Sequence, residues 1–165
     1  MKGGLKAYME VVVKIQTRRC WIRAFGLEDA EALQCVLGDG EVMRYIETPF
    51  TLAQTEAFIH HAGLCEPPLV YAVVWKETGS VIGHVIFHPY DGEFHEIGWI
   101  ISRAYWGVGI ACELTEALIQ QAKALNKGCV LECHPAQAAT KRIAQKYGFV
   151  YEGQSDGCDV YRLNI

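Results

Sequence analysis

The alternation of apolar and polar residues along the chain predicts a succession of short strands and amphipathic helices. Apolar, β-branched and aromatic runs bounded by turn residues predict strands at residues 13–23, 69–76, 80–88, 94–101, 129–133, 149–152 and 159–164. Apolar residues spaced three and four apart, together with capping signals, predict helices at residues 27–37, 51–61, 107–126 and 136–147. The helix at 107–126 is the clearest, with an apolar stripe made of Ala111, Leu114, Leu118, Ala122 and Leu125.

The order of these elements predicts the fold class. The strands between residues 69 and 101 are joined by tight turns, so they form an antiparallel meander. The strand–helix–strand–helix order that follows places helices on both faces of the sheet. We therefore expect an α+β fold with a mixed, mostly antiparallel sheet of about seven strands. No segment resembles a linker, so residues 1–165 form a single domain, with 1–12 as a ragged N-terminal extension or part of the first strand.

Composition narrows the class of protein. The chain has 165 residues, with 15 Lys and Arg against 19 Asp and Glu and a formal net charge of −4. This balance gives no bulk attraction to nucleic acid or to an anionic membrane. No apolar run reaches the ~18 residues of a membrane span. The segment 1–10 lacks the apolar core of a secretory signal. These features predict a soluble, cytoplasmic protein.

The cysteines point to the same compartment. There are seven, and an odd count without an export signal predicts reduced thiols. Cys129, Cys133 and His134 are close in sequence, but their spacing matches none of the usual zinc patterns. We therefore predict no metal site.

The segment from His95 to Ala111 carries the candidate chemistry. A strand enters a glycine-containing turn that opens the long helix, so unpaired N–H groups meet the positive end of the helix dipole. Gly107 and Gly109 lack a Cβ, which lets a phosphate approach the main chain of residues 107–111. The residues of a nucleoside-triphosphate loop or a dinucleotide fingerprint are missing. A helix start that merely needs room to turn would show the same pair of glycines.

A wider pattern resembles the GCN5-related N-acetyltransferase (GNAT) superfamily, and most closely its ribosomal-protein N-terminal acetyltransferase (RimJ/RimL-like) branch. Residues 96–99 match the branch's Glu-Ile-Gly-aromatic strand, and residues 105–113 match its Tyr-Trp-Gly-x-Gly-x-Ala-x-Glu turn. Gln137, Thr140 and residues 146–149 stand for its later Asn-x-x-Ser and Lys-x-Gly-Phe positions. The segment from Thr17 to Arg23 also resembles the first strand of the branch, so the likeness covers about residues 15–165.

The resemblance implies acetyl-CoA as the donor and a primary amine as the acceptor. The pantetheine arm would pair with Ile100 and Ile101, and Gln137 and Thr140 would stand where relatives have Asn and Ser. Arg103 would supply charge to a phosphate, because Ala104 replaces a frequent Gln or Arg. The pyrophosphate would bind the N–H groups of Trp106, Gly107, Val108, Gly109, Ile110 and Ala111.

Glu96 is the candidate catalytic base. Strand alternation places it on one face with Phe94, Gly98 and Ile100, where burial would make it a more competent proton acceptor. A carboxylate paired with Arg23, Arg103 or a buried backbone donor is the structural alternative. The oxyanion donor is expected from a main-chain N–H of Ile100 or Ile101. Three histidines of the same meander could shuttle a proton or lie on an exposed face: His84, His88 and His95.

Two departures from the branch leave parts of the chemistry open. Ala144 stands where many relatives have a Tyr that protonates the leaving thiolate, so water, Tyr147 or no enzyme group would do so here. Gln137 is one methylene longer than Asn, which can displace its contact. Lys141, Arg142 and Lys146 either attract the 3′-phosphate of CoA or form a solvated face.

These residues predict an N-acetyltransferase that moves the acetyl group directly to the amine in a ternary complex. The alternative is a non-catalytic module that binds or senses acyl-CoA, which Ala144 and Gln137 would favour. Protein N-termini, polyamines, aminoglycosides and amino acids all stay open as acceptors. Dimerisation through a strand edge or the first helices also stays open.

Overall fold

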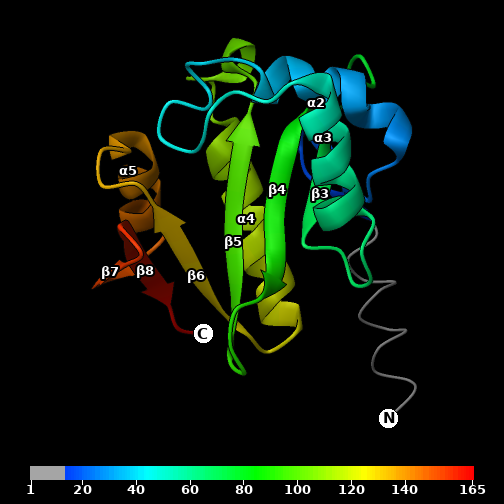
Figure 1. Ribbon diagram of the computed structural model, residues 1–165. Helices are drawn as coiled ribbons and strands as arrows, with labels where there is room; N and C mark the ends of the chain where they lie inside the picture. The colour runs from blue at the N-terminus through cyan, green and yellow to red at the C-terminus, as the bar shows by residue number, and fades with distance from the viewer. Residues whose placement is uncertain (1–13) are drawn as a thin grey trace.

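The computed structural model describes residues 14–165 (Figure 1), so the predicted N-terminal extension at 1–12 lies outside the described residues. Its strands are β1 (Lys14–Gln16), β2 (Cys20–Arg23), β3 (Val70–Trp75), β4 (Val81–Pro89), β5 (Phe94–Ile101), β6 (Gly128–Cys133), β7 (Val150–Ser155) and β8 (Cys158–Leu163). Its α-helices are α2 (Ala30–Leu37), α3 (Leu52–Phe58), α4 (Ile110–Ala124) and α5 (Ala138–Lys146). The 3₁₀ helices η1 (Leu27–Asp29) and η3 (Arg103–Tyr105) and the π-helix η2 (Ile59–Gly63) are shorter.

The strands form one mixed sheet in the order β1-β2-β3-β4-β5-β6-β8-β7. Every neighbouring pair is antiparallel except β5 and β6, which are parallel. The predicted fold class is therefore confirmed, with eight strands where about seven were expected. The predicted strand at 13–23 is broken by a tight turn, in which Thr17 N–H and its hydroxyl both donate to the Cys20 carbonyl, at 2.9 and 3.2 Å.

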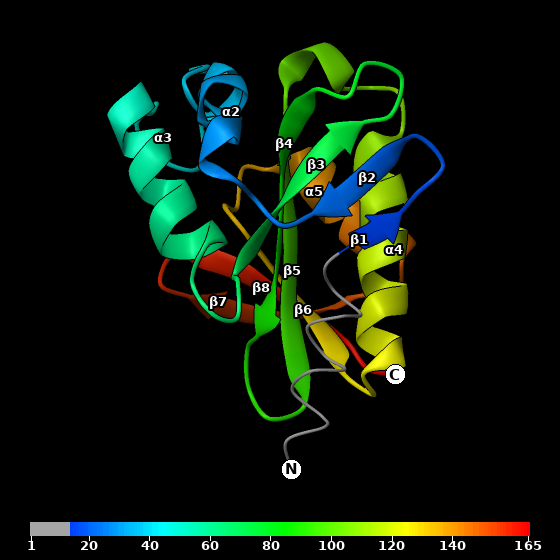
Figure 2. The ribbon, with the colours of Figure 1, turned by 90° about the vertical axis from the view of Figure 1, so that its right-hand side faces the viewer.

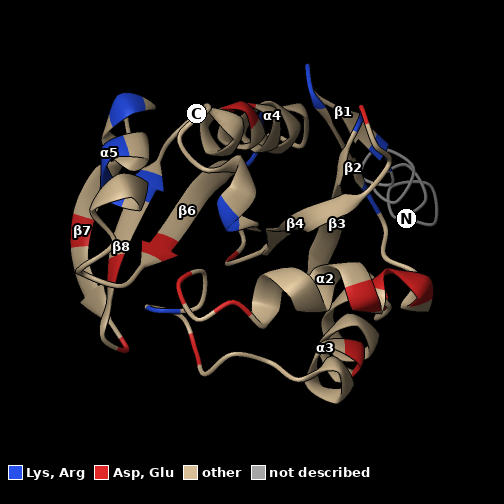
Figure 3. Cartoon of the chain, turned by 90° about the horizontal axis from the view of Figure 1, so that it is seen from above, with Lys and Arg blue, Asp and Glu red and all other residues tan. Residues whose placement is uncertain are grey.

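Helices cover both faces of the sheet. Figures 2 and 3 show α2 and α3 on one face and α4 and α5 on the other. Leu114 and Leu118 from the predicted stripe of α4 are fully buried against the sheet. On the opposite face, Leu33 and Leu37 of α2 pack with Ile59 against β3. None of the helices in residues 14–165 has the length and apolar character needed to cross a membrane.

Helix ends follow local capping chemistry. The predicted capping box at Thr51 is present: the Thr51 hydroxyl accepts from Gln54 N–H at 3.2 Å, and Gln54 Oε1 accepts from Thr51 N–H at 2.8 Å. The long helix begins at Ile110 and not at Gly107, because Gly109 is its N-cap in the left-handed conformation, with φ of 88°.

The relation between β5 and β6 positions the site. These parallel strands are paired only through Phe94–Gly128, His95–Cys129 and Glu96–Val130. Beyond Glu96 they diverge, and Figure 1 shows the two arrows separating toward their carboxyl ends. The sheet therefore has a V-shaped split, whose apex lies at Glu96 and whose sides are β5 and the β6–α5 segment.

Candidate active site

A groove of about 670 Å³ occupies the split in the sheet. Its walls come from the carboxyl end of β5, the turn before α4 with the first residues of that helix, one side of α5 along its length and the loop between α2 and α3. Ile100 and Ile101 both line it, although neighbouring residues of a strand point to opposite faces. The groove therefore connects the two faces of the sheet through the split.

The turn before α4 contributes main-chain donors to this groove. Gly107 and Gly109 have positive φ angles of 75° and 88°, so the chain doubles back before the helix begins. Within residues 14–165, no main-chain or side-chain acceptor receives an N–H of residues 107–112. These donors lie at the N-terminus of a helix of 15 residues, an arrangement that favours an anion.

The open edge of β5 adds a second set of main-chain groups. Ser102 N–H donates to the Ile82 carbonyl of β4 at 2.8 Å. Because antiparallel ladders alternate, Ile100 also directs its main-chain groups toward β4, while Trp99 and Ile101 direct theirs toward the split. The Ile101 carbonyl is already used, since Trp106 Nε1 donates to it at 2.9 Å. Trp99, which sequence reasoning did not select, is therefore the more available partner.

Glu96 lies at the apex of the split, outside the lining of the groove and on the sheet face covered by α2 and α3. Its Oε2 is 3.1 Å from Nε2 of His88, the residue opposite it on β4. The carboxylate does not pair with either arginine considered from the sequence. Arg23 binds Asp29 and Arg103 binds Asp39, with nearest N–O distances of 2.7 and 3.2 Å.

A second carboxylate stands on the other arm of the split. Glu132 of β6 lies two residues beyond Val130, the partner of Glu96, and therefore on the same face. Tyr90 donates its hydroxyl to Glu132 Oε1 at 2.7 Å. Sequence reasoning did not select this residue, because only the register of β5 with β6 brings it near Glu96.

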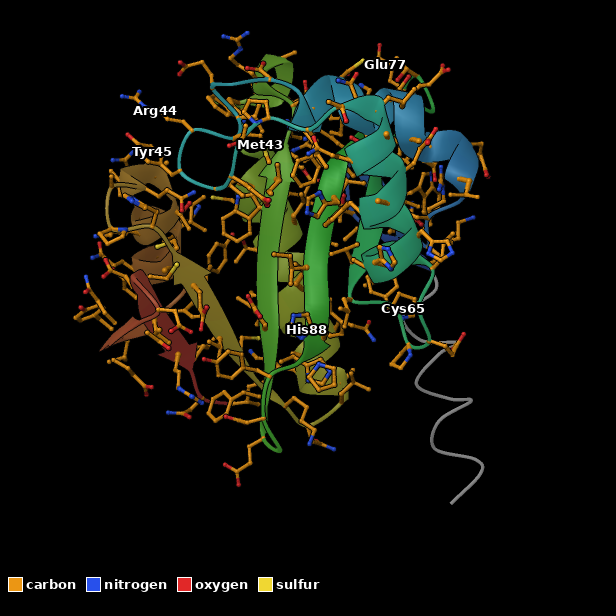
Figure 4. The ribbon with its side chains drawn as sticks, viewed as in Figure 1. Met43, Arg44, Tyr45, Cys65, Glu77 and His88 are labelled. Atoms are coloured by element: carbon orange, nitrogen blue, oxygen red, sulfur yellow. The ribbon has the colours of Figure 1, made fainter. Side chains whose placement is uncertain are left out.

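The other histidines of the meander have different surroundings. His84 and His95 are buried, and burial lowers the pKa of each to about 4. Both rings are therefore neutral at physiological pH. His88 is partly exposed, and Figure 4 shows it low on β4, away from the loop of Met43 and Tyr45.

That loop closes the groove from above. Figure 4 shows Met43, Arg44 and Tyr45 on the segment that passes over the upper end of β5 toward α5. The Tyr45 ring stacks on His134, with centroids 5.1 Å apart. The stack ties the α2–α3 connection to the β6–α5 connection across the split.

Comparison with known proteins agrees with this geometry. Residues 19–150 match the family described as the acetyltransferase (GNAT) domain. The chain belongs to the GNAT acetyltransferase family. It is 30% identical over 148 residues to a Bacillus subtilis protein named uncharacterized N-acetyltransferase YnaD, a match that covers 87% of this chain and 86% of that protein.

Solved structures share the fold of this acetyltransferase. A GNAT-family acetyltransferase from Bacillus anthracis superposes with a TM-score of 0.79 at 27% identity, covering 90% of this chain and 95% of the other. RimL, a ribosomal L7/L12 alpha-N-protein acetyltransferase solved with coenzyme A, gives a TM-score of 0.78 at 17% identity, covering 92% and 98%. The predicted superfamily is confirmed, and the fold neighbours include the branch that the motifs indicated.

The remaining predicted ligand contacts of this acetyltransferase are divided between the groove and the surface. Gln137 and Thr140 line the groove, and Gln137 Oε1 accepts from His134 N–H at 2.8 Å, which leaves its amide nitrogen to donate. Ile110 and Ala111 line it as well, whereas Val108 and Arg103 do not. Arg103 is held at the surface by Asp39.

The basic residues of α5, blue in Figure 3, have separate partners. Arg142 and Lys146 line the groove. Lys141 instead binds Asp159 of β8, with Nζ and Oδ2 2.7 Å apart. The two groove residues are the positive charges that a phosphate on this side would meet.

The groups considered for the leaving thiolate lie elsewhere in this acetyltransferase. Ala144 is fully buried in the core between α5 and the sheet. Tyr147 donates its hydroxyl to the Cys112 carbonyl at 3.1 Å and does not line the groove.

Burial raises the pKa of Cys133 to about 11, so this cysteine is a neutral thiol at physiological pH. Among residues 14–165, no group of three His, Cys, Asp or Glu side chains is arranged to hold a metal ion.

Proposed function

We propose that this protein binds acetyl-CoA in the split of the sheet and acetylates a primary amine there in a ternary complex. Acetyl-CoA supplies an activated acetyl group as a thioester. The proposal rests on three features that follow one another between residues 96 and 112. These are Glu96 at the apex, the open edge at Trp99 and Ile101, and the anion-binding turn at 107–112.

Different residues of the groove bind different parts of the coenzyme. The N–H groups of residues 107–112 bind the pyrophosphate at the dipole of α4. The main-chain groups of Trp99 and the N–H of Ile101 hold the pantetheine arm, as a strand would be held at a sheet edge. Gln137 and Thr140 contact the arm from α5, while Arg142 and Lys146 face the nucleotide phosphates.

Glu96 acts on the acceptor. An alkyl amine with a pKa near 10.4 is mostly an ammonium at neutral pH and must lose a proton before it can attack. Glu96 takes this proton, directly or through water, on the face of the sheet opposite α4. The amine nitrogen then bonds to the acetyl carbon, the carbon–sulfur bond breaks, and CoA leaves as a thiolate that takes up the second amine proton through water. An N–H of β5 that faces the split stabilises the oxyanion between these steps.

The acceptor is a primary amine of a protein or a small molecule. A protein N-terminus is one candidate, because the fold neighbour RimL is an alpha-N-protein acetyltransferase. We place the reaction in the cytoplasm, where the seven free cysteines would stay reduced.

Thiol release and product mass test the proposal. Purified protein is mixed with acetyl-CoA and each of four amines: a peptide with a free N-terminus, spermidine, an aminoglycoside and free lysine. We expect acetylated product from at least one. Glu96→Gln should lower kcat about a hundredfold and leave the Kd for CoA unchanged, whereas Glu93→Gln, at an exposed turn position, should change neither. Tight CoA binding without product from any amine would instead indicate an acyl-CoA-binding module.

A further inference from the structure

Arg19 links the turn between β1 and β2 to the anion-binding turn at 107–112. Its Nη2 donates to the main-chain carbonyl of Val108 at 2.9 Å, and its Nε donates to Glu113 Oε2 at 2.8 Å. The two contacts use different nitrogens of one planar guanidinium, so they fix its orientation. Arg19 therefore touches the turn from the side away from the groove, because Val108 does not line the groove.

The guanidinium itself is held by a network on α4. Glu113 Oε1 accepts from Arg19 N–H at 2.6 Å and from the Thr17 hydroxyl at 2.7 Å. Burial alone would raise the pKa of Glu113, but these hydrogen bonds prevail and lower it. The carboxylate is therefore ionised at neutral pH and accepts from Thr17 and Arg19, two of the three residues between β1 and β2.

The contact to Val108 sets the direction of the next N–H. A trans peptide is planar, so its carbonyl and its N–H point to opposite sides. Arg19 draws the Val108 carbonyl away from the groove, and the N–H of Gly109 consequently points toward it. Gly109 does line the groove, with φ of 88°. Glycine adopts either sign of φ at similar cost, so without an external contact this peptide could rotate.

We infer that Arg19 is a positioning residue, which holds the Val108–Gly109 peptide with its N–H toward the groove and so sets the affinity for the CoA pyrophosphate. The inference rests on the proposed function, since it assumes that CoA occupies this groove. A rotated peptide would present the Val108 carbonyl to the pyrophosphate in place of a donor. Two negatively polarised groups would then face each other.

The test separates the geometry of Arg19 from its charge. Arg19→Lys keeps the charge but cannot reach Glu113 and Val108 together in the forked arrangement. Arg19→Gln removes the charge, and Arg18→Gln removes the charge of the exposed neighbour as a matched control. Calorimetry measures the Kd of each folded variant for CoA, and titration followed by NMR measures it for pantetheine, which lacks the pyrophosphate.

We expect Arg19→Lys and Arg19→Gln to raise the Kd for CoA about tenfold and to leave the Kd for pantetheine unchanged. Arg18→Gln should bind both like the wild type. In the wild type, the Gly109 amide resonance should shift when CoA or inorganic pyrophosphate is added, and in Arg19→Lys this shift should shrink.

Three outcomes would contradict different parts of the argument. If wild-type protein fails to bind CoA, the proposed function itself is wrong. If the wild type binds CoA and Arg19→Lys binds it equally well, the positioning role is overturned while the proposed function stands. An equal loss of CoA and pantetheine affinity in the Arg19 variants would likewise contradict the inference, because it would indicate a general disturbance of the groove.

Discussion

His88 and Glu96 face each other across β4 and β5, with Nε2 of the imidazole 3.1 Å from Oε2 of the carboxylate. The other ring nitrogen lies 2.9 Å from the Pro89 carbonyl oxygen. Both oxygens accept hydrogen bonds only if both ring nitrogens carry protons, so the contact stabilises the imidazolium. The hydrogen bond to Glu96 accordingly raises the pKa of His88. The proposed base therefore works beside a group whose charge changes with pH.

Replacing His88 with Gln should remove a pH-dependent part of the stability. A pKa raised in the folded protein gives stability that is complete below the unfolded value and is lost as pH rises through the folded value. We expect the free energy of unfolding of the wild type to exceed that of His88→Gln by about 0.5–1 kcal/mol at pH 6 and by less at pH 9. Urea unfolding at the two pH values measures this difference. A difference that does not change with pH would refute it.

Replacing His84 with Leu should protect the protein against acid. His84 is buried beside Phe58, and burial lowers its pKa to about 4. A depressed folded pKa gives stability that is present above the unfolded value near 6.5 and is lost as pH falls toward 4. From these values, the free energy of unfolding of the wild type should fall by about 2 kcal/mol between pH 7 and pH 5 because His84 takes up a proton on unfolding. His84→Leu should not show this decrease. Parallel acid sensitivity of the two proteins would show that His84 is not responsible.

Alanine at the turn glycines should weaken the binding of CoA. Gly107 and Gly109 have positive φ angles, which cost a residue with a Cβ about 1 kcal/mol. An alanine that relaxes to negative φ also turns the nearby N–H groups away from the groove, so we expect Gly107→Ala and Gly109→Ala to raise the Kd for CoA about tenfold.

Gly79→Ala is the matched control for these variants. Gly79 has φ of 72°, free space around its Cβ position and a place in the turn between β3 and β4. It should lose similar stability in urea and keep the wild-type affinity for CoA. Equal losses of affinity at all three positions would mean that destabilisation alone explains the effect.

Lys146→Gln should weaken the binding of CoA more than the binding of 3′-dephospho-CoA. Lys146 lines the groove from α5, and an exposed charge there acts on a phosphate through a screened attraction. We expect the Kd for CoA to rise about threefold at low salt and less at high salt. Lys123→Gln, on an exposed part of α4 outside the groove, should leave the Kd for CoA and the Kd for 3′-dephospho-CoA unchanged. Calorimetry measures the Kd of each protein for both ligands at two ionic strengths.

Local features were predictable where neighbouring residues in sequence determine them. The capping box of Thr51 and Gln54 and the buried stripe of Leu114 and Leu118 follow from spacing along the helix alone. The predicted helix start at Gly107 was three residues early, because Gly109 adopts the left-handed conformation and caps the helix, which the sequence does not reveal. The first strand was less predictable, because the turn at Thr17 depends on hydrogen bonds that β-propensity does not reveal.

Partners from distant segments were not predictable. The sequence placed Glu96 near Arg23 or Arg103 as alternatives to catalysis, yet each arginine binds an aspartate and Glu96 faces His88. The register of β4 with β5 decides that pairing, and a shift by one residue would turn Glu96 to the opposite face.

The sequence by itself determined the order of strands and helices and the glycine turn before α4. It also determined that Glu96 belongs to β5, the strand before that turn. These features depend on residues close together in the chain. Tertiary structure alone decided that β5 and β6 part after Glu96, that Trp99 and Ile101 face the resulting split, and that Arg19 holds the Val108 carbonyl. These relations join segments as much as 89 residues apart. They depend on strand register and packing, which spacing along the chain does not specify.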